Sequence, residues 1–139
     1  MVYLFPIKEF IPKNKFDYEA INKLKSIDPA RYNLQPIMSQ LFEWIQDINW
    51  PVAQELCPVL ASLKPEDIIP HIKMVLQSGD DCWQYACIQF LIPALPTEVK
   101  LEIAPDLLRI IKAPTTNEKL CEIDETAREI YEDIIGKLS

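Results

Sequence analysis

Apolar residues recur along this chain at helical spacing, and prolines and short polar segments interrupt them. Three stretches share one pattern, in which a proline is followed by apolar residues at the second, fifth and sixth positions after it. The three prolines are Pro36, Pro70 and Pro105, which lie 34 and then 35 residues apart. Self-similarity at this period is typical of stacked helical pairs. The pattern therefore predicts an all-α fold.

The same spacing predicts about seven helices, which span roughly 18–26, 36–46, 50–63, 70–77, 81–92, 97–113 and 124–138. The chain has only two glycines and twelve prolines. Few glycines disfavour β-hairpins and phosphate-binding loops, because both need conformations that glycine adopts most readily. We expect the prolines to start and separate helices, and Pro58 to kink one from inside. A chain of 139 residues is predicted to form a single domain, 1–139.

Several polar side chains are placed to bind the free N–H groups at helix starts. Asp17, Asp81 and Asp124 are predicted N-caps, with Gln84 as the capping-box partner of Asp81. Gly79 is predicted to end the preceding helix in a left-handed conformation.

The segment before the first helix, about 1–16, is expected to form an extended arm. Pro6 and Pro12 each hold the residue before them out of the α region. Apolar residues such as Phe10 and Ile11 would let this arm lie across the first helices.

A second alignment supports the repeat. The sequence Asp-x-x-Trp-x-x-Ala occurs twice at an interval of 33 residues, as Asp47, Trp50 and Ala53 and again as Asp80, Trp83 and Ala86. We expect the aspartate to accept N–H groups at the start of the next helix, and the tryptophan to pack over the junction with its indole N–H on a carbonyl. On this basis Asp47→Ala should cost about 1 kcal/mol of stability.

These residues also carry a resemblance to known proteins. The pattern Asp-x-x-Trp-x-Val-x-x-x-Leu, which begins at Asp47, resembles the HEAT-like helical repeat, in which an aspartate orders the turn into the first helix. The blocks at 11–17, 43–54 and 124–127 resemble a bacterial family designated domain of unknown function 5071. The resemblance implies a compact α-α superhelix, which we expect to be a short right-handed solenoid. It implies no activity and no catalytic residue.

The net charge of the chain indicates which class of partner we expect the protein to bind. The formal net charge is −7 and the sequence pI is about 4.7. An acidic surface repels phosphate backbones, so we expect no nucleic acid ligand. A protein or peptide partner, basic in the version that the charge favours, is the better electrostatic match. No prediction of oligomeric state follows from the sequence.

The four cysteines predict no metal site and no cofactor. Cys57, Cys82, Cys87 and Cys121 form no Cys-x-x-Cys pair, and the single His71 does not complete a zinc set at the usual spacing. Reduced thiols are typical of the cytoplasm, where we expect the protein. No stretch has the length or apolarity of a membrane span, so no membrane association is expected.

The best candidates for a functional surface are tryptophans, carboxylates and an amide at the two adjacent inter-helix turns. They are Trp44, Asp47, Asn49, Trp50, Asp81 and Trp83. Such a set suits a pocket for a cationic or amide-bearing side chain. The alternative is that these positions serve only the stacking of repeats, and burial of the tryptophans would distinguish the two. His71 has no second catalytic group near it in sequence, and we expect it to be half exposed.

Two functions fit this sequence. The first is a non-enzymatic module that binds a protein or peptide, in an immunity-like or regulatory role. The alternative is an enzyme or small-ligand-binding protein whose pocket is built from the tryptophans and aspartates of the turns. The absence of a serine nucleophile elbow or a Cys-His pair in the sequence favours the first.

Overall fold

The structure is a computed structural model, which describes residues 6–138. Its α-helices are α1 (Tyr18–Ser26), α2 (Gln35–Glu43), α3 (Pro51–Ala61), α4 (Pro65–Gln77), α5 (Asp81–Ala86), α6 (Thr97–Lys112), α7 (Thr116–Leu120) and α8 (Ile123–Gly136). Short 3₁₀ segments lie at η1 (Ile7–Phe10), η2 (Pro29–Arg31) and η4 (Ile92–Ala94), and η3 (Cys87–Leu91) is a π-helix. No strand occurs between residues 6 and 138, so the all-α prediction is confirmed.

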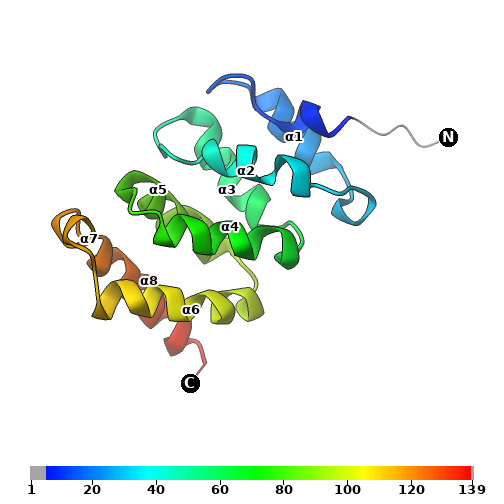
Figure 1. The fold of residues 1–139 in the computed structure, drawn as a ribbon. Coiled ribbons are helices and arrows are strands. Elements are labelled where there is room, and N and C mark those ends of the chain that lie inside the picture. Colours follow the sequence, from blue (N-terminus) through cyan, green and yellow to red (C-terminus); the bar gives the residue numbers. More distant parts are fainter. Residues whose placement is uncertain (1–5, 139) are drawn as a thin grey trace.

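Many helices pack against helices that are not their direct neighbours in sequence, and α6 packs on α8. Helix α1 packs on α3, α3 on η3, and α5 and η3 on α8, while α4 lies between α2 and α6. Figure 1 shows the elements following one another from the N-terminal to the C-terminal end, with α2, α4 and α6 stacked in succession. One cluster of buried side chains extends from Phe10 to Ile134.

The hydrophobic register of the three proline-led stretches is as predicted. Eight of the nine apolar positions are buried, among them Met38, Ile72 and Leu107, and only Ile111 is half-buried. The predicted helix starts were less accurate. Pro70 does not open a helix, because α4 already begins at Pro65.

The interior prolines explain this error. Pro58, Pro70 and Pro105 lie inside α3, α4 and α6, and all three are exposed to solvent. Each removes one helical hydrogen bond, but on an exposed face water can bind the carbonyl that is left free. Helix α6 therefore continues through Pro105 rather than restarting there.

Two of the predicted helix starts, those of α5 and α8, depend on other residues than expected. Asp17 does cap α1, since its Oδ1 accepts the Ala20 N–H at 3.3 Å, and Gly79 follows α4 with a φ of 78°. The N-cap of α5, however, is Asp80 rather than Asp81, because the Trp83 N–H donates to Asp80 Oδ1 at 3.1 Å.

The predicted capping box at Gln84 does not form, because its amide is buried and donates to other groups. Asp124 is not a cap either. Helix α8 begins after Glu122, whose φ of 59° turns the chain sharply out of α7. Asp124 instead lies 3.6 Å from the Lys119 ammonium.

The predicted N-terminal arm is only partly extended, and residues 1–5 of it lie outside the described residues. Ile7–Phe10 form a 3₁₀ turn, and Phe10 and Pro12 are buried. The Lys15 carbonyl accepts the Val52 N–H at 3.1 Å. The arm thus satisfies a free donor at the start of α3, where Asp47 was expected to act.

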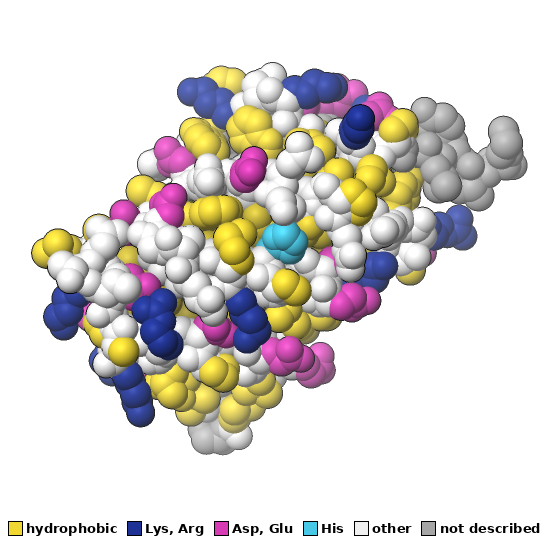
Figure 2. Space-filling view, in the orientation of Figure 1, with side chains coloured by type: hydrophobic (Ala, Val, Ile, Leu, Met, Phe, Trp, Pro, Cys, Tyr) yellow, Lys and Arg dark blue, Asp and Glu magenta, His cyan; other side chains and the backbone are white. Residues whose placement is uncertain are grey.

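Hydrophobic and polar side chains are intermixed on the face of the molecule shown in Figure 2. Figure 2 shows Lys and Arg side chains scattered over one face rather than gathered into a patch, with Asp and Glu side chains between them. Histidine appears near the middle of this face.

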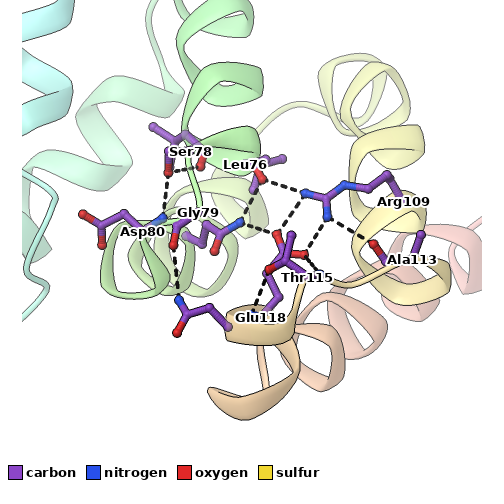
Figure 3. Close-up of polar contacts among 11 residues, drawn as sticks. Leu76, Ser78, Gly79, Asp80, Arg109, Ala113, Thr115 and Glu118 are labelled. Atoms are coloured by element: carbon purple, nitrogen blue, oxygen red, sulfur yellow. Dashed lines mark hydrogen bonds and ion pairs between the residues drawn. The ribbon is translucent and has the colours of Figure 1, made fainter.

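Helix α7 lies between the predicted helices 97–113 and 124–138, where no helix was expected, and an ion pair with one buried partner, Glu118, holds it in place (Figure 3). The Glu118 carboxylate is 1% exposed. Its two oxygens accept from the two terminal nitrogens of Arg109 at 2.6 and 2.9 Å, from the Gln84 amide at 2.7 Å and from the Thr115 N–H at 2.8 Å. Gln84 and Arg109 also donate to the Leu76 carbonyl, at 2.8 and 3.0 Å. The network therefore joins the ends of α4 and α6 to α7.

The charge of Glu118 is stabilised in the folded protein. Burial alone raises the pKa of this carboxyl, but the Arg109 guanidinium, the Thr115 N–H and the Gln84 amide outweigh burial and lower the pKa below its ordinary value. A lowered carboxyl pKa contributes stability above the pKa of the unfolded chain, and this stability is lost as the pH falls through the folded value.

We expect Glu118→Gln to lower the free energy of unfolding by about 2 kcal/mol at neutral pH, because it leaves the Arg109 guanidinium without its counterion. The variant should also lose less stability than the unchanged protein as the pH falls below 4.5. Urea titrations at pH 7 and at steps down to pH 3 measure both effects. Glu125→Gln, at an exposed position of α8, is the control and should change stability little. Equal stability of the two variants at pH 7 would contradict the role assigned to the ion pair.

Candidate functional site

A half-open pocket of about 430 Å³ lies where the turn between α2 and α3 meets α5, η3 and the junction of α7 and α8. Its polar lining comes from Asp47, Asn49, Gln54 and Asp81, and its aromatic lining from Tyr85 and Phe90. We call this the acidic pocket. Three of the six site residues predicted from the sequence therefore come together in it: Asp47, Asn49 and Asp81.

Asp47 has a different local role from the helix cap that the sequence suggested. Its Oδ1 accepts the Asn49 N–H at 2.9 Å, which closes a turn before α3. The N-cap position of α3 belongs to Trp50, which makes no side-chain capping bond. The Asp47 side chain therefore does not cap α3, and Asp47 Oδ2 accepts no hydrogen bond from residues 6–138.

Asp81 is held in place by α7. Its Oδ1 accepts the Asn117 side-chain amide at 3.2 Å, and the same amide donates to the Gly79 carbonyl at 3.2 Å. The Asn117 hydrogen bond is the main reason that the pKa of Asp81 lies below its ordinary value. Asp81 is consequently ionised at neutral pH.

Neither carboxylate of the pocket is neutralised by a neighbouring cation. Among the described residues, no Lys or Arg nitrogen forms an ion pair with Asp47 or Asp81. Some carboxylates elsewhere are paired at short range, as in the 2.8 Å contact between Lys73 and Asp106. The pocket therefore holds uncompensated negative charge.

The pKa values of two exposed thiols in the pocket, those of Cys82 and Cys121, are raised by partial burial and by this charge. Cys82 Sγ lies 3.7 Å from Asp81 Oδ2, and Cys121 Sγ lies 3.6 Å from Asn117 Oδ1. Partial burial raises the pKa of both thiols, and the Asp81 carboxylate raises it further. Asp80 and Asp47 add to the effect at Cys82. Both groups are therefore protonated at neutral pH and are poor nucleophiles.

The aromatic wall of the pocket depends on the π-helix. The Tyr85 and Phe90 rings meet edge to face with centroids 6.2 Å apart, and they are 40% and 38% exposed. In a regular α-helix, residues five apart point about 140° away from each other around the axis. In η3 the Ile92 N–H donates to the Cys87 carbonyl, five residues back, and this wider turn brings the two rings to one side.

The three tryptophans lie outside the lining of the acidic pocket. Trp44 and Trp50 meet edge to face at 5.5 Å and line a smaller hollow of about 210 Å³ with Glu43 and Gln46. The Trp83 indole N–H donates to the Phe42 carbonyl at 2.9 Å, as predicted for a residue that packs over a junction. All three rings are half-buried.

The two Asp-x-x-Trp units are not structurally equivalent. Asp80 caps α5 and Trp83 is the third residue of that helix, whereas Asp47 precedes a turn and Trp50 is the residue before α3. The sequence match at an interval of 33 residues therefore does not extend to local backbone structure.

His71 is half-buried and does not line the acidic pocket. Its ring stacks on Phe42 with centroids 5.3 Å apart. Burial lowers the pKa of His71, and the charge of Asp67, one helical turn earlier, opposes this only in part.

A larger hollow of about 570 Å³ lies between α6 and α8. Leu108, Ile111 and Tyr131 line it together with charges of both signs. The acidic pocket is the better candidate, because its charges are of one sign and the pKa values of Asp81, Cys82 and Cys121 are shifted. Between residues 6 and 138, no group of three or more His, Cys, Asp or Glu is placed to hold a metal ion. No helix in this range is long and apolar enough to cross a membrane.

A family model with the description "Domain of unknown function (DUF5071)" matches residues 10–131. No curated protein matches the chain.

We expect Asp81→Asn to speed the alkylation of Cys82 and Cys121, because removal of the carboxylate charge lowers the pKa of both thiols. Iodoacetamide labelling at pH 8, followed by peptide mass spectrometry, measures the rate at each cysteine. Cys57, whose pKa burial raises to about 12, should stay unlabelled until urea is added. Glu98→Gln, at an exposed position of α6, is the control. An unchanged rate in Asp81→Asn would mean that the carboxylate does not determine the thiol pKa.

Stability should fall as the pH is lowered from 7 to 5, because the folded protein disfavours protonation of His71 more than the unfolded chain does. His71→Phe keeps a ring against Phe42 and does not titrate. We expect this variant to have a flatter dependence of unfolding free energy on pH over that range. Urea titrations at four pH values test it, and identical slopes for the two proteins would rule His71 out as the cause.

Proposed function

The chain belongs to the family described as domain of unknown function DUF5071, and we propose that it is a non-enzymatic module that binds a basic segment of another protein. The acidic pocket is the binding site. The observation that carries the proposal is the pair of ionised carboxylates, Asp47 and Asp81, which face one pocket without a cation partner. A cationic side chain would supply the missing positive charge.

The distribution of charge along the chain favours a basic partner. Residues 1–33 contain six Lys or Arg and four Asp or Glu, a net charge of +2. Residues 34–139 contain eight Lys or Arg and seventeen Asp or Glu, a net charge of −9. The pocket lies in this second part, so a basic partner would be attracted toward it from solution.

The fold suits such a role if its helices form a short right-handed HEAT-like solenoid. Support comes from the packing of alternate helices and from the repeated hydrophobic register. A stack of this kind holds successive inter-helix turns at one edge, which is where Asp47 and Asp81 lie. A small acidic protein that captures basic segments would fit an immunity-like or regulatory role. The four free cysteines favour a cytoplasmic location.

A small-ligand site remains the alternative, because the pocket volume falls within the range of small-molecule pockets. Catalysis has less support. The lowered pKa of Asp81 makes it a weak general base, both exposed thiols are protonated, and His71 lies elsewhere. Binding of a cation requires none of these groups to react.

A fluorescein-labelled basic peptide of twelve residues, with lysine and arginine in equal number, tests the proposal by fluorescence anisotropy. We expect saturable binding that weakens with added salt, and no binding of an acidic peptide of the same length. The double variant Asp47→Asn/Asp81→Asn should weaken binding about tenfold or more.

Glu98→Gln/Glu102→Gln is the matched control, because it removes the same charge from exposed positions of α6. It should change the affinity by less than about twofold. If both double variants lost the same affinity for the peptide, the interaction would be a general electrostatic attraction to the acidic protein. The pocket would then be rejected as the binding site. Failure of the basic peptide to bind would also reject the proposal.

A further inference from the structure

The geometry points to arginine, rather than lysine, as the side chain that the acidic pocket receives from the partner's basic segment. This inference rests on the proposed function and makes it more specific. It depends on three features of the pocket: the spread of its acceptors, its aromatic wall and the fixed orientation of Asp81.

The acceptors come from three separate elements. Asp47 lies in the turn before α3, Gln54 lies on α3, and Asp81 begins α5. The Gln54 amide nitrogen donates to the Ile48 carbonyl at 3.2 Å, which leaves its carbonyl oxygen for a ligand. A guanidinium presents five N–H donors fanned out in a plane, whereas an ammonium presents three from one nitrogen. Acceptors spread around a pocket match the first arrangement better.

The aromatic wall offers a surface on which a planar cation stacks. Tyr85 and Phe90 are among the large hydrophobic side chains that remain exposed in this structure. A guanidinium packs flat against an aromatic ring and is more weakly hydrated than an ammonium, so it loses less on leaving water. Ile48 and Ile123 also line the pocket and would contact the methylene groups of the arginine side chain.

Asp81 is oriented before any ligand arrives. Asn117 holds its Oδ1, and Asn117 precedes Glu118, which the buried network fixes between Arg109 and Gln84 (Figure 3). A carboxylate in a fixed orientation loses less freedom on binding a two-pronged donor. This advantage is greater for arginine, which binds carboxylates through two parallel hydrogen bonds, than for lysine.

Two labelled peptides that differ only by replacement of every arginine with lysine test the inference at equal charge and salt. We expect the arginine peptide to bind at least about tenfold more tightly. Tyr85→Ala/Phe90→Ala should bring the two affinities together, because it removes the stacking surface but leaves both carboxylates. Asp47→Asn/Asp81→Asn should weaken both peptides. Circular dichroism before each titration confirms that the variants are folded.

The outcomes separate this inference from the proposed function. If the lysine peptide binds as tightly as the arginine peptide and Asp47→Asn/Asp81→Asn weakens both, the arginine assignment is wrong and the binding function stands. A preference for arginine that survives in Tyr85→Ala/Phe90→Ala would also overturn the assignment to this pocket. If neither peptide binds, the proposed function fails. Finally, N-acetyl-arginine amide that competes as well as the whole arginine peptide would indicate a small-molecule site and exclude a protein segment as the ligand.

Discussion

One buried carboxylate, that of Glu118, determines how the C-terminal half of this structure is assembled. Helix α7 has only five residues, and a helix of this length is unstable by itself in water. It persists because Glu118 exchanges water for a guanidinium, a side-chain amide and a backbone N–H. The guanidinium and the side-chain amide also donate to the Leu76 carbonyl at the end of α4. The same network positions one side of the acidic pocket, because Asn117 of α7 holds Asp81 and Cys121, the residue after α7, lines the pocket.

The parts of the fold that the sequence predicts are those that depend on local periodicity. The positions of Met38, Ile72 and Leu107 on buried helix faces follow from spacing alone, because an amphipathic helix must turn its apolar stripe inward. The residues at which helices begin and end depend less on the local sequence and more on packing. Whether Pro70 starts a helix or lies within one depends on the exposure of its face, which only the packed structure determines.

Long-range partners account for most of what the sequence did not predict. The spacing of Asp81 and Gln84 suggests a capping box, but the Gln84 amide meets Glu118, 34 residues away. Helix α7 has no apolar stripe to predict it, since its only buried side chain is this charged one. The residues of the candidate site likewise include some that the sequence pointed to and some that it did not. Asp47 belongs to the repeat and Asp81 adjoins its second copy at Asp80, whereas the approach of Tyr85 and Phe90 depends on a π-turn that the spacing of a regular α-helix does not predict.

The strongest argument for the acidic pocket is that unpaired carboxylates, exposed aromatic rings and an unusual backbone turn coincide there. Carboxylates without cation partners can be explained by solvation alone, and exposed aromatic rings are individually unremarkable. A π-turn needs a separate explanation, because its wider backbone turn is rare and is found mostly where function requires it. Here the turn brings Phe90 beside Tyr85 at the edge of a pocket whose charge is uncompensated. Solvation of Asp47 and Asp81 requires neither ring, whereas recognition of a planar cation uses the rings and the carboxylates together.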